Sequence, residues 1–359
     1  MPEISWWRTS FGEDEIRRIS DAIAHEHISQ GPVTAEFERK LADVLGVPYV
    51  IATTSGSMAL LMALLAARVG PGDEVIVPNR TWIATAHAPI LLGAKVVLTD
   101  VEADRPIIDT SQIEQKITPR TKVIMPVHLN GRSANMERIN RIAAAHNVLV
   151  IEDAAQALCS RNVLGLLGCQ SFAGCFSLSV AKIISTGQGG FLVTRRAEIY
   201  ERLRLMRTHG VSDVVNASYT QIGFNFRFTD ILASIGIVQL QRLLDRINKV
   251  KAIYTKYAVA MPDLPFLKLI PVDVEAGEIP IYVEVLCRER EKLIQFLASH
   301  GIQARPFYPD LDLAGYFGSA TEFPNSRAFS RQGLFLPCGP EQPLENVERV
   351  LETLYLYTK

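Results

Sequence analysis

The chain has 359 residues, of which 48% are hydrophobic, so it is long enough to bury a large core and to form more than one domain. Its 37 basic and 38 acidic side chains leave a formal net charge of -1, which gives no electrostatic case for binding nucleic acid or an anionic membrane. The first residues lack the features of a signal peptide, and no stretch reaches the roughly 20 apolar residues of a spanning helix. We therefore expect a cytoplasmic protein with neither nucleic-acid nor membrane partners.

The five cysteines are an odd number without a regular framework, which is typical of reduced thiols in a cytosolic protein. Cys159, Cys169 and Cys175 lie close in the sequence but contain no Cys-x-x-Cys pair. We therefore expect no metal site.

The first part of the chain predicts an α/β fold. Two helices are expected at 14–25 and 34–45, the second introduced by Gly31-Pro32. Short apolar runs then alternate with helical spacing. This alternation favours parallel strands covered by helices on both faces. The predicted strands are 74–78, 95–99, 122–127, 148–152, 174–178 and 190–194, and the predicted helices between them are 57–68 and 136–146.

A long amphipathic helix is predicted at 239–257, leading out of the first domain. Pro262, Pro265 and Pro271 interrupt the helical pattern beyond it, so we place the boundary near residue 261. Residues 1–260 then form a large domain with an N-terminal helical segment, and residues 261–359 form a smaller C-terminal α+β domain. The latter is expected to contain strand 281–286, helix 288–300, strand 303–308 and a final helix at 343–357.

Lys182 is the most informative residue of the chain. It lies between Ser177 and the glycine-rich run 186–190, downstream of an apolar strand that ends in Asp153. Pyridoxal phosphate needs a lysine, an acid for its ring nitrogen and donors for its phosphate. An attacking lysine amine must be neutral, and the apolar neighbours of Lys182 favour a lowered pKa. Together these residues predict a pyridoxal phosphate site.

Two of these residue patterns have other interpretations when each is taken alone. Gly56 and Ser57 open a predicted helix, where backbone N–H groups bind a phosphate or where a serine simply caps the helix. Asp153 ends a strand, where an acid also binds magnesium or caps a helix. Glu152 alternates away from Asp153, so we rank Asp153 first.

In the order and spacing of its motifs, most of the chain resembles the DegT/DnrJ/EryC1/StrS sugar aminotransferases, within the fold type I, aspartate aminotransferase-like pyridoxal phosphate enzymes. The resemblance implies a large domain with a mostly parallel seven-stranded sheet. The last third of the chain resembles the family more weakly. The motifs are Gly31-Pro32, Thr54-Ser55-Gly56-Ser57, Gly70-Pro71-Gly72-Asp73, Asn79-Arg80-Thr81-Trp82, Pro126-Val127-His128, Glu152-Asp153-Ala154-Ala155-Gln156, the Lys182 segment and Gly223-Phe224-Asn225.

The resemblance implies roles for the residues at the matching positions. Lys182 and Asp153 are expected to be catalytic, with Lys182 carrying pyridoxal 5'-phosphate and Asp153 holding its ring nitrogen protonated. Asn225 is expected to reach the phosphate of a neighbouring subunit, which implies a homodimer with active sites at the interface. The further cofactor-binding residues are expected to be Gly56, Ser57 and Ser177 at the phosphate, Trp82 over the ring and Gln156 beside it.

The activity implied is transfer of an amino group from L-glutamate to a nucleotide-linked keto-deoxysugar. The products are 2-oxoglutarate and an amino sugar, and pyridoxamine 5'-phosphate is the form of the cofactor between the two halves of the cycle. A keto-cyclitol acceptor is an alternative. Sugar dehydratases of this fold carry histidine in place of the lysine, so Lys182 disfavours them, and regulatory proteins of this fold commonly lose the lysine or the acid.

Two departures from the family concern the substrate side. Ser179 stands where many relatives have histidine, and Asp310-Leu311-Asp312 follows Tyr308-Pro309 where some relatives also have histidine. The run Thr186-Gly187-Gln188-Gly189-Gly190 inclines us toward amination at C4 of the sugar. The sequence leaves open the nucleotide, the stereochemistry and whether glutamine replaces glutamate as donor.

Overall fold

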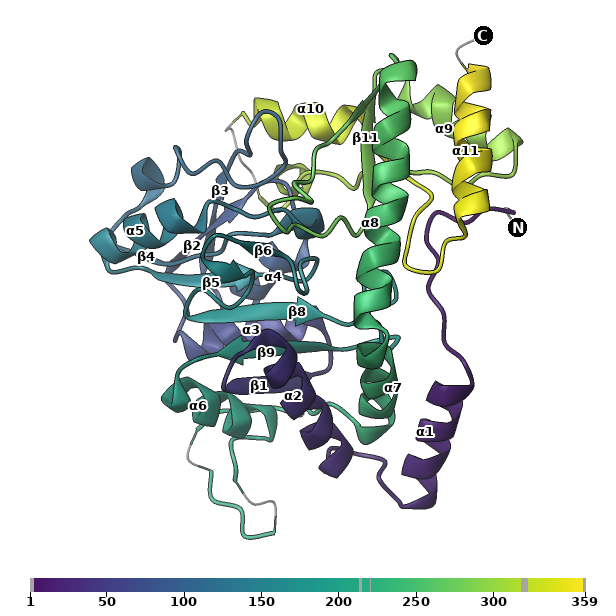
Figure 1. The fold of residues 1–359 in the computed structure, drawn as a ribbon. Helices are drawn as coiled ribbons and strands as arrows, with labels where there is room; N and C mark the ends of the chain where they lie inside the picture. Colours follow the sequence, from purple (N-terminus) through teal and green to yellow (C-terminus); the bar gives the residue numbers. More distant parts are fainter. Residues whose placement is uncertain (1–2, 213–214, 220, 318–321, 358–359) are drawn as a thin grey trace.

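The computed structural model describes residues 3–212, 215–219, 221–317 and 322–357. Most of the chain is arranged around two β-sheets (Figure 1). The large sheet has the strand order β1-β9-β8-β5-β4-β2-β3, and the small sheet has the order β10-β11-β13-β12. The large-sheet strands are β1 (Tyr49–Thr53), β2 (Glu74–Pro78), β3 (Lys95–Thr99), β4 (Thr121–Ile124), β5 (Leu149–Asp153), β8 (Ala173–Ser177) and β9 (Gly190–Thr194).

The large sheet is mostly parallel, as the sequence predicts. Strands β3, β2, β4, β5 and β8 pair in parallel in that spatial order, and β9 lies antiparallel between β8 and β1. In parallel sheets the strand ends that point the same way meet at one edge, and ligands bind beyond the carboxyl ends. The chain segments that leave β2, β4, β5 and β8 therefore lie near one another.

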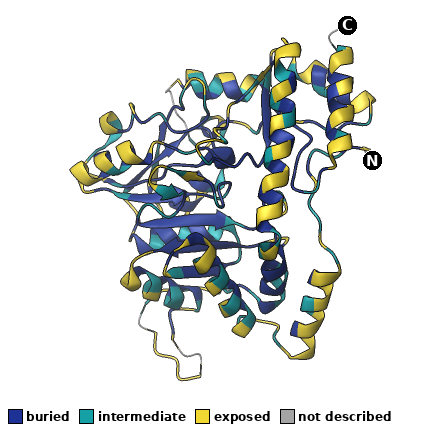
Figure 2. Cartoon of the chain, in the orientation of Figure 1, coloured by how far each residue is buried: buried dark blue, intermediate teal, exposed yellow. Residues whose placement is uncertain are grey.

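The strands of this sheet are largely buried beneath helices (Figure 2). Successive side chains of each strand alternate between the two faces, so helices pack on both of them. Ile51, Val75 and Val77 pack with α3, α4 and α6 on one face. Ala52 and Ile76 belong to the cores on the opposite face, with α2, α5 and α7. The helices are α2 (Pro32–Leu45), α3 (Gly56–Ala66), α4 (Ala84–Leu91), α5 (Met136–His146), α6 (Ala197–Arg207) and α7 (Asp230–Gln241).

The predicted helix 239–257 is wrong in its start, because the chain forms two helices that meet at Arg242. α7 ends at Gln241, and α8 (Leu243–Ala260) begins one residue later. α7 is buried on several sides, so its apolar pattern lacks the period of a surface helix. Arg242 forms ion pairs with Asp14 and Glu15 of α1 (Glu13–Ala24), which fix the turn.

The small sheet has its own core, which also includes the C-terminal half of α8. Leu267, Val285 and Leu336 pack there with Tyr257 of α8 and with Trp7 from the N-terminal segment. The domain boundary at residue 261 stays a prediction. The elements are β10 (Leu267–Leu269), β11 (Val283–Cys287), β12 (Arg305–Pro306), β13 (Gly333–Leu336), α9 (Arg290–Ser299), α10 (Pro324–Gln332) and α11 (Leu344–Tyr357).

The remaining elements are short. They are the hairpin β6 (Arg161–Asn162) and β7 (Gly165–Leu166) and the 3-10 turns η1 (Glu114–Lys116), η2 (Leu129–Gly131), η3 (Met261–Asp263) and η4 (Leu311–Leu313). Over the described ranges, no helix combines the length and apolar character needed to cross a membrane. The same ranges contain no group of three or more His, Cys, Asp or Glu side chains that could hold a metal ion.

Candidate active site

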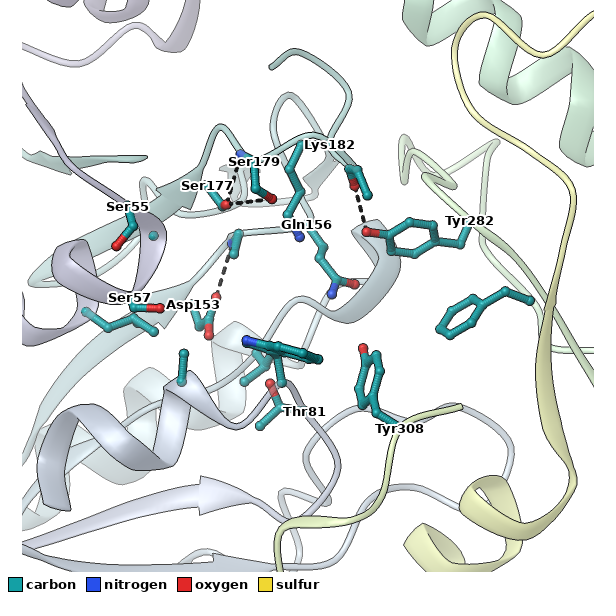
Figure 3. Close-up of a pocket in the computed structure, with 18 of the residues that line it drawn as sticks. Ser55, Ser57, Thr81, Asp153, Gln156, Ser177, Ser179, Lys182, Tyr282 and Tyr308 are labelled. Carbon is teal, nitrogen blue, oxygen red and sulfur yellow. Dashed lines mark hydrogen bonds between the residues drawn. The ribbon is translucent and has the colours of Figure 1, made fainter. Parts of the chain in front are cut away.

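A pocket of about 940 Å³ lies between the carboxyl edge of the large sheet and the small sheet (Figure 3). One side is polar and comes from the ends of large-sheet strands. The other side is rich in aromatic side chains and comes from the small-sheet region and the N-terminal segment. Seven of the eight residues predicted to bind the cofactor line this pocket, namely Gly56, Ser57, Trp82, Asp153, Gln156, Ser177 and Lys182.

Lys182 lies in the turn that follows β8, and its side chain points into the pocket (Figure 3). Burial lowers the pKa of Lys182 to about 8, and the negative charge of Asp153 opposes this shift. A lysine with this pKa has a substantial neutral fraction near neutral pH. Its amine is therefore suited to attack a carbonyl group.

Asp153 is the last residue of β5, and its carboxylate is fixed by two donors. The Thr85 hydroxyl donates to Oδ2 at 2.8 Å, and the Ala155 N–H donates to Oδ1 at 3.1 Å. Burial raises the pKa of Asp153, and these two hydrogen bonds and the charge of Lys182 partly oppose the rise. Asp153 thus presents an oriented carboxylate close to a lysine.

Glu152, the neighbour of Asp153, faces away from the pocket and has a different function in the structure. Its side chain accepts hydrogen bonds from the Gly168 N–H at 2.7 Å and the Ser171 hydroxyl at 2.8 Å. Its Oε2 also lies 3.0 Å from Nε2 of the buried His128. Glu152 is therefore occupied in holding the loop between β5 and β8.

The start of α3 forms one end of the pocket. Ser55, not Ser57, is the N-cap, because its hydroxyl accepts the Met58 N–H at 3.1 Å. The N–H groups of Gly56 and Ser57 are in the first helical turn, where no acceptor exists within the helix and the helix dipole attracts anions. These two N–H groups can therefore bind an anion.

Close contacts around Gly56 explain why a glycine opens this helix. A Cβ atom at position 56 would lie 2.9 Å from Cβ of Ser177, and one at Gly190 would lie 2.4 Å from the Ser55 carbonyl carbon. The glycines thus let β8 and β9 approach the start of α3. Ser177 Oγ also accepts the Ser179 N–H at 3.3 Å, so the Ser179 that replaces the family histidine lies at this end of the pocket.

Trp82 and Gln156 lie where the aromatic side of the pocket meets the polar side. The Trp82 side chain is 56% exposed, and its ring meets Tyr308 edge-on with centroids 5.4 Å apart. Gln156 is buried, and its Oε1 accepts the Asn130 N–H at 2.8 Å. Gln156 and Tyr308 both line the pocket. Trp82 leaves a ring face open to the pocket, as a stacked planar ligand requires.

Asp310 and Asp312, which replace the family pattern after Tyr308, are anchoring residues outside the pocket lining. Asp310 Oδ1 lies 3.0 Å from a guanidinium nitrogen of Arg80, and both side chains are almost completely buried. Asp312 accepts a hydrogen bond from the Asn79 side chain at 2.9 Å. These contacts attach the loop that carries Trp82 to the segment that carries Tyr308.

Asn225 is the predicted cofactor residue that this pocket does not include. Its side chain is exposed and accepts a hydrogen bond from Nε of Arg227 at 2.9 Å. Asn225 therefore cannot contact a ligand in the pocket of its own chain without a rearrangement. Its predicted role at a neighbouring subunit stays a prediction.

Sequence reasoning missed several residues that shape the pocket. Thr85 lies in the first turn of α4, and its hydroxyl is 3.0 Å from the hydroxyl of Thr81, which precedes the helix. Trp6, Tyr282, Arg305 and Phe335 come from four separate segments, and no local pattern connects them. They form the aromatic side of the pocket.

The residues present fit pyridoxal phosphate, and this fit rests on the geometry of both ends of the pocket. An anion-binding helix start and the Ser177 hydroxyl suit the phosphate, while the buried Asp153 suits a ring nitrogen. Lys182 supplies the amine, and Trp82 supplies a flat apolar face between these ends. The arrangement can hold a planar ligand with an anionic tail and carry out amine chemistry on it.

Comparison with known proteins agrees with this geometry. A sequence profile of the DegT/DnrJ/EryC1/StrS aminotransferase family matches residues 9–355. The chain is 35% identical to a GDP-perosamine synthase of Caulobacter vibrioides, with 91% of this chain and 90% of the relative covered. The structure resembles S. venezuelae DesV, with a TM-score of 0.92, 29% identity and coverage of 96% and 94% of the two chains. It also resembles the pyridoxal phosphate form of Spr1654, a sugar aminotransferase of Streptococcus pneumoniae, with a TM-score of 0.91, 27% identity and coverage of 97% and 96%.

Proposed function

Because this chain belongs to the DegT/DnrJ/EryC1/StrS aminotransferase family, we propose that it moves an amino group from L-glutamate to a nucleotide-linked keto-deoxysugar. The chain is a pyridoxal phosphate-dependent aminotransferase of amino-sugar biosynthesis. The observation that carries the proposal is the placement of Lys182 and Asp153 in one pocket with an anion-binding helix start. The pocket is also large enough for a sugar beside the cofactor, at about 940 Å³.

The proposed roles of the residues follow from their contacts. Pyridoxal phosphate supplies an electron sink that stabilises negative charge on the carbon next to a substrate amine. Asp153 keeps the ring nitrogen protonated, and the Thr85 hydroxyl holds the carboxylate in place for this. Gly56, Ser57 and Ser177 bind the phosphate, and Trp82 covers the ring.

Lys182 moves the proton in this proposal. Its Nζ removes the α-proton of glutamate in one half-reaction and delivers a proton to the former keto carbon of the sugar in the other. A base suited to both directions has a pKa near the working pH, and burial brings the pKa of Lys182 to about 8. One side chain thus serves both half-reactions.

The acceptor is proposed from the family resemblance and from the named relatives. A GDP-perosamine synthase acts on a nucleotide-linked sugar by its name, and it aligns over most of both chains. The glycine-rich run Thr186-Gly187-Gln188-Gly189-Gly190 supports C4 of the sugar as the site of amination. A nucleotide-linked 4-keto-deoxysugar is therefore the first acceptor to test.

A homodimer is proposed from the surface around Asn225. Tyr219 and Ile222 are each 80% exposed, and Phe224 is 59% exposed in the same loop. Exposed apolar side chains that gather in one loop are typical of a contact surface. Burying them against a second copy of the chain would bring Asn225 toward the partner's phosphate site.

The first test of the function follows nitrogen from donor to acceptor. The purified enzyme is incubated with ¹⁵N-glutamate and a panel of nucleotide-linked 4-keto-deoxysugars and free keto-cyclitols, and products are identified by mass spectrometry. Label in an amino sugar nucleotide is expected. Label in cyclitols alone, or in neither class, would overturn the proposed acceptor, while glutamate-dependent bleaching of the cofactor's visible band separately reports the donor half-reaction.

A mixing experiment tests the proposed dimer. Lys182→Ala and Asn225→Ala are each expected to be inactive as homodimers. If Asn225 acts across the interface, subunit exchange gives heterodimers in which Lys182 of one subunit meets Asn225 of the other, and activity returns. If Asn225 acts within its own chain, neither site of the heterodimer is complete, so absence of recovery after verified exchange would refute the shared site.

A further inference from the structure

Arg305 is a pocket-lining cation without an assigned task. The charged residues that line the pocket are Asp153, Lys182 and Arg305. Asp153 has two hydrogen-bond donors, and Lys182 supplies the reacting amine. The Arg305 side chain is exposed, and within the described part of the chain its guanidinium forms no hydrogen bond or ion pair. Its charge is therefore available to a ligand.

Arg305 is held in one orientation even though it lacks a charged partner. Its backbone pairs with Phe335 of β13, and its guanidinium carbon lies 4.6 Å from the centre of the Trp6 ring. Trp6 is itself held in place, because its backbone N–H donates to Oε1 of Gln303 at 3.2 Å and its ring stacks on Tyr282 with centroids 5.9 Å apart. A guanidinium stacked on a ring keeps the N–H donors along its edges free for a planar or tetrahedral anion.

The position of Arg305 relative to Lys182 favours a long substrate. The Tyr282 hydroxyl donates to the Ala181 carbonyl at 2.7 Å, next to Lys182 in the chain. Contacts through the Tyr282 and Trp6 rings thus connect the Lys182 turn to the Arg305 guanidinium. The α-carboxylate of an amino acid is one bond from the reacting carbon, so a cation that binds it must lie beside the Lys182 amine. In a nucleotide-linked sugar, a whole pyranose ring separates C4 from the diphosphate.

We propose that Arg305, held by Trp6, binds the diphosphate of the nucleotide-linked acceptor. The inference rests on the proposed function and names the part of the substrate that the aromatic side of the pocket recognises. A guanidinium forms paired, charge-assisted hydrogen bonds with phosphate oxygens, and such bonds are stronger than neutral ones. A free cyclitol offers no group of this kind, so Arg305 also discriminates against it.

The test measures binding directly as well as turnover. The holoenzyme and its Arg305→Gln and Arg305→Lys variants are titrated with GDP, UDP and dTDP in a calorimeter. Arg305→Gln is expected to weaken binding of the preferred nucleotide by about tenfold or more, because a hydrogen bond to a charged group is lost. Arg305→Lys is expected to retain part of the affinity, since it keeps the charge without the paired donors.

Arg331→Gln is the matched control. Arg331 is an exposed arginine of α10 that does not line the pocket, so its loss is expected to leave nucleotide affinity unchanged. Affinity of the wild type should also fall more steeply with added salt than affinity of Arg305→Gln. The glutamate half-reaction, followed by bleaching of the cofactor band, should keep its rate in all three arginine variants.

Each other outcome has a definite meaning. Unchanged nucleotide affinity in Arg305→Gln overturns the inference and leaves the proposed function intact if the wild type still aminates a nucleotide-linked sugar. A defect confined to the glutamate half-reaction assigns Arg305 to a donor carboxylate and also overturns it. A wild type that binds none of the three nucleotides and aminates only cyclitols refutes both proposals.

Discussion

The two sides of the pocket are built in different ways. We call Asp153, Ser177, Lys182 and the start of α3 the floor, and we call Trp6, Tyr282, Phe335 and residues 305–308 the wall. The floor consists of polar groups at the ends of neighbouring strands, each within a short motif. The wall consists mainly of aromatic side chains and one arginine, drawn from four separate segments of the chain.

The difference reflects what each side must do. A floor that holds a charged nitrogen, a phosphate and a reactive amine needs particular functional groups at fixed positions, so few residue types will serve. A wall that selects an acceptor needs shape and one well-placed charge, which many residue sets provide. Substitutions in the floor should therefore abolish chemistry, and substitutions in the wall should change which acceptor is used.

The largest effect is expected from Lys182→Ala in the floor. Loss of the only proposed proton carrier should lower kcat by about 10⁴-fold. Borohydride trapping followed by peptide mass mapping should then find no cofactor on the 182 peptide. Lys268→Ala, which removes an exposed lysine of β10, is the control and should leave both readouts unchanged. Retained turnover in Lys182→Ala would contradict the assignment.

The second largest effect concerns the buried Arg80–Asp310 ion pair outside the pocket lining, which joins the loop that carries Trp82 to the segment that follows the wall residues 305–308. Arg80→Met leaves the buried Asp310 with Arg327, at 3.4 Å, as its remaining cationic neighbour. The loss of the buried partner should lower the free energy of unfolding by about 3 kcal/mol. Replacing both residues, as Arg80→Met with Asp310→Leu, should recover most of this loss because no lone charge remains. Urea unfolding of the variants measures the effect. A single variant as stable as the wild type would show that the pair contributes little.

A change of pH is expected to have an intermediate effect on cofactor uptake. This effect should depend on the floor residue Lys182 and not on the wall. Since the pKa of Lys182 is lowered to about 8, its amine is mostly protonated below that pH and mostly neutral above it. Uptake of pyridoxal phosphate by the apoprotein should therefore speed up by about tenfold per pH unit below 8 and level off above it. Rapid mixing with absorbance detection measures these rates.

Substitution of Asp153 sharpens the same experiment. The carboxylate charge raises the pKa of Lys182, so Asp153→Asn should move the midpoint of the uptake profile to lower pH. Tyr308→Phe in the wall should leave the midpoint in place. A shift of equal size in both variants would mean that floor and wall are not electrostatically distinct.

The smallest effect is expected from Tyr308→Phe, on the KM for the acceptor. The variant loses the Tyr308 hydroxyl, which lies in the pocket, but keeps the ring beside Trp82. Loss of one neutral hydrogen bond between this hydroxyl and the acceptor would cost about 1 kcal/mol, which corresponds to about fivefold in KM for the acceptor. Steady-state kinetics with each substrate varied should show this change in the KM for the ketosugar. An equal change in the KM for glutamate would argue against separate roles for floor and wall.

Much of the fold was predictable because local patterns determine it. Strands 74–78, 95–99 and 190–194 have the predicted bounds, since each is a short, mostly apolar run between turns. The break at Arg242 was missed because ion pairs with distant Asp14 and Glu15 fix it. The predicted strand 303–308 is reduced to Arg305–Pro306 in the structure.

The same distinction between local patterns and distant contacts applies to the candidate site. Lys182, Asp153 and Gly56 lie within motifs whose neighbours indicate their chemistry. Trp6 and Tyr282 come together only after the N-terminal segment packs against the small sheet, and no spacing along the chain reports that contact. Asp310 was noticed as a departure from the family, but its pairing with Arg80 required the folded chain.

The Arg80–Asp310 pair has a consequence for how such proteins recombine. Consider a chimaera that joins residues 1–260 of this chain to the C-terminal part of a relative without an acid at position 310. It would bury the Arg80 guanidinium of the 79–82 loop without its carboxylate partner. The exchange should succeed only if the 79–82 loop is transplanted together with the 305–313 segment. These two segments, far apart in the gene, are therefore expected to be inherited as one unit.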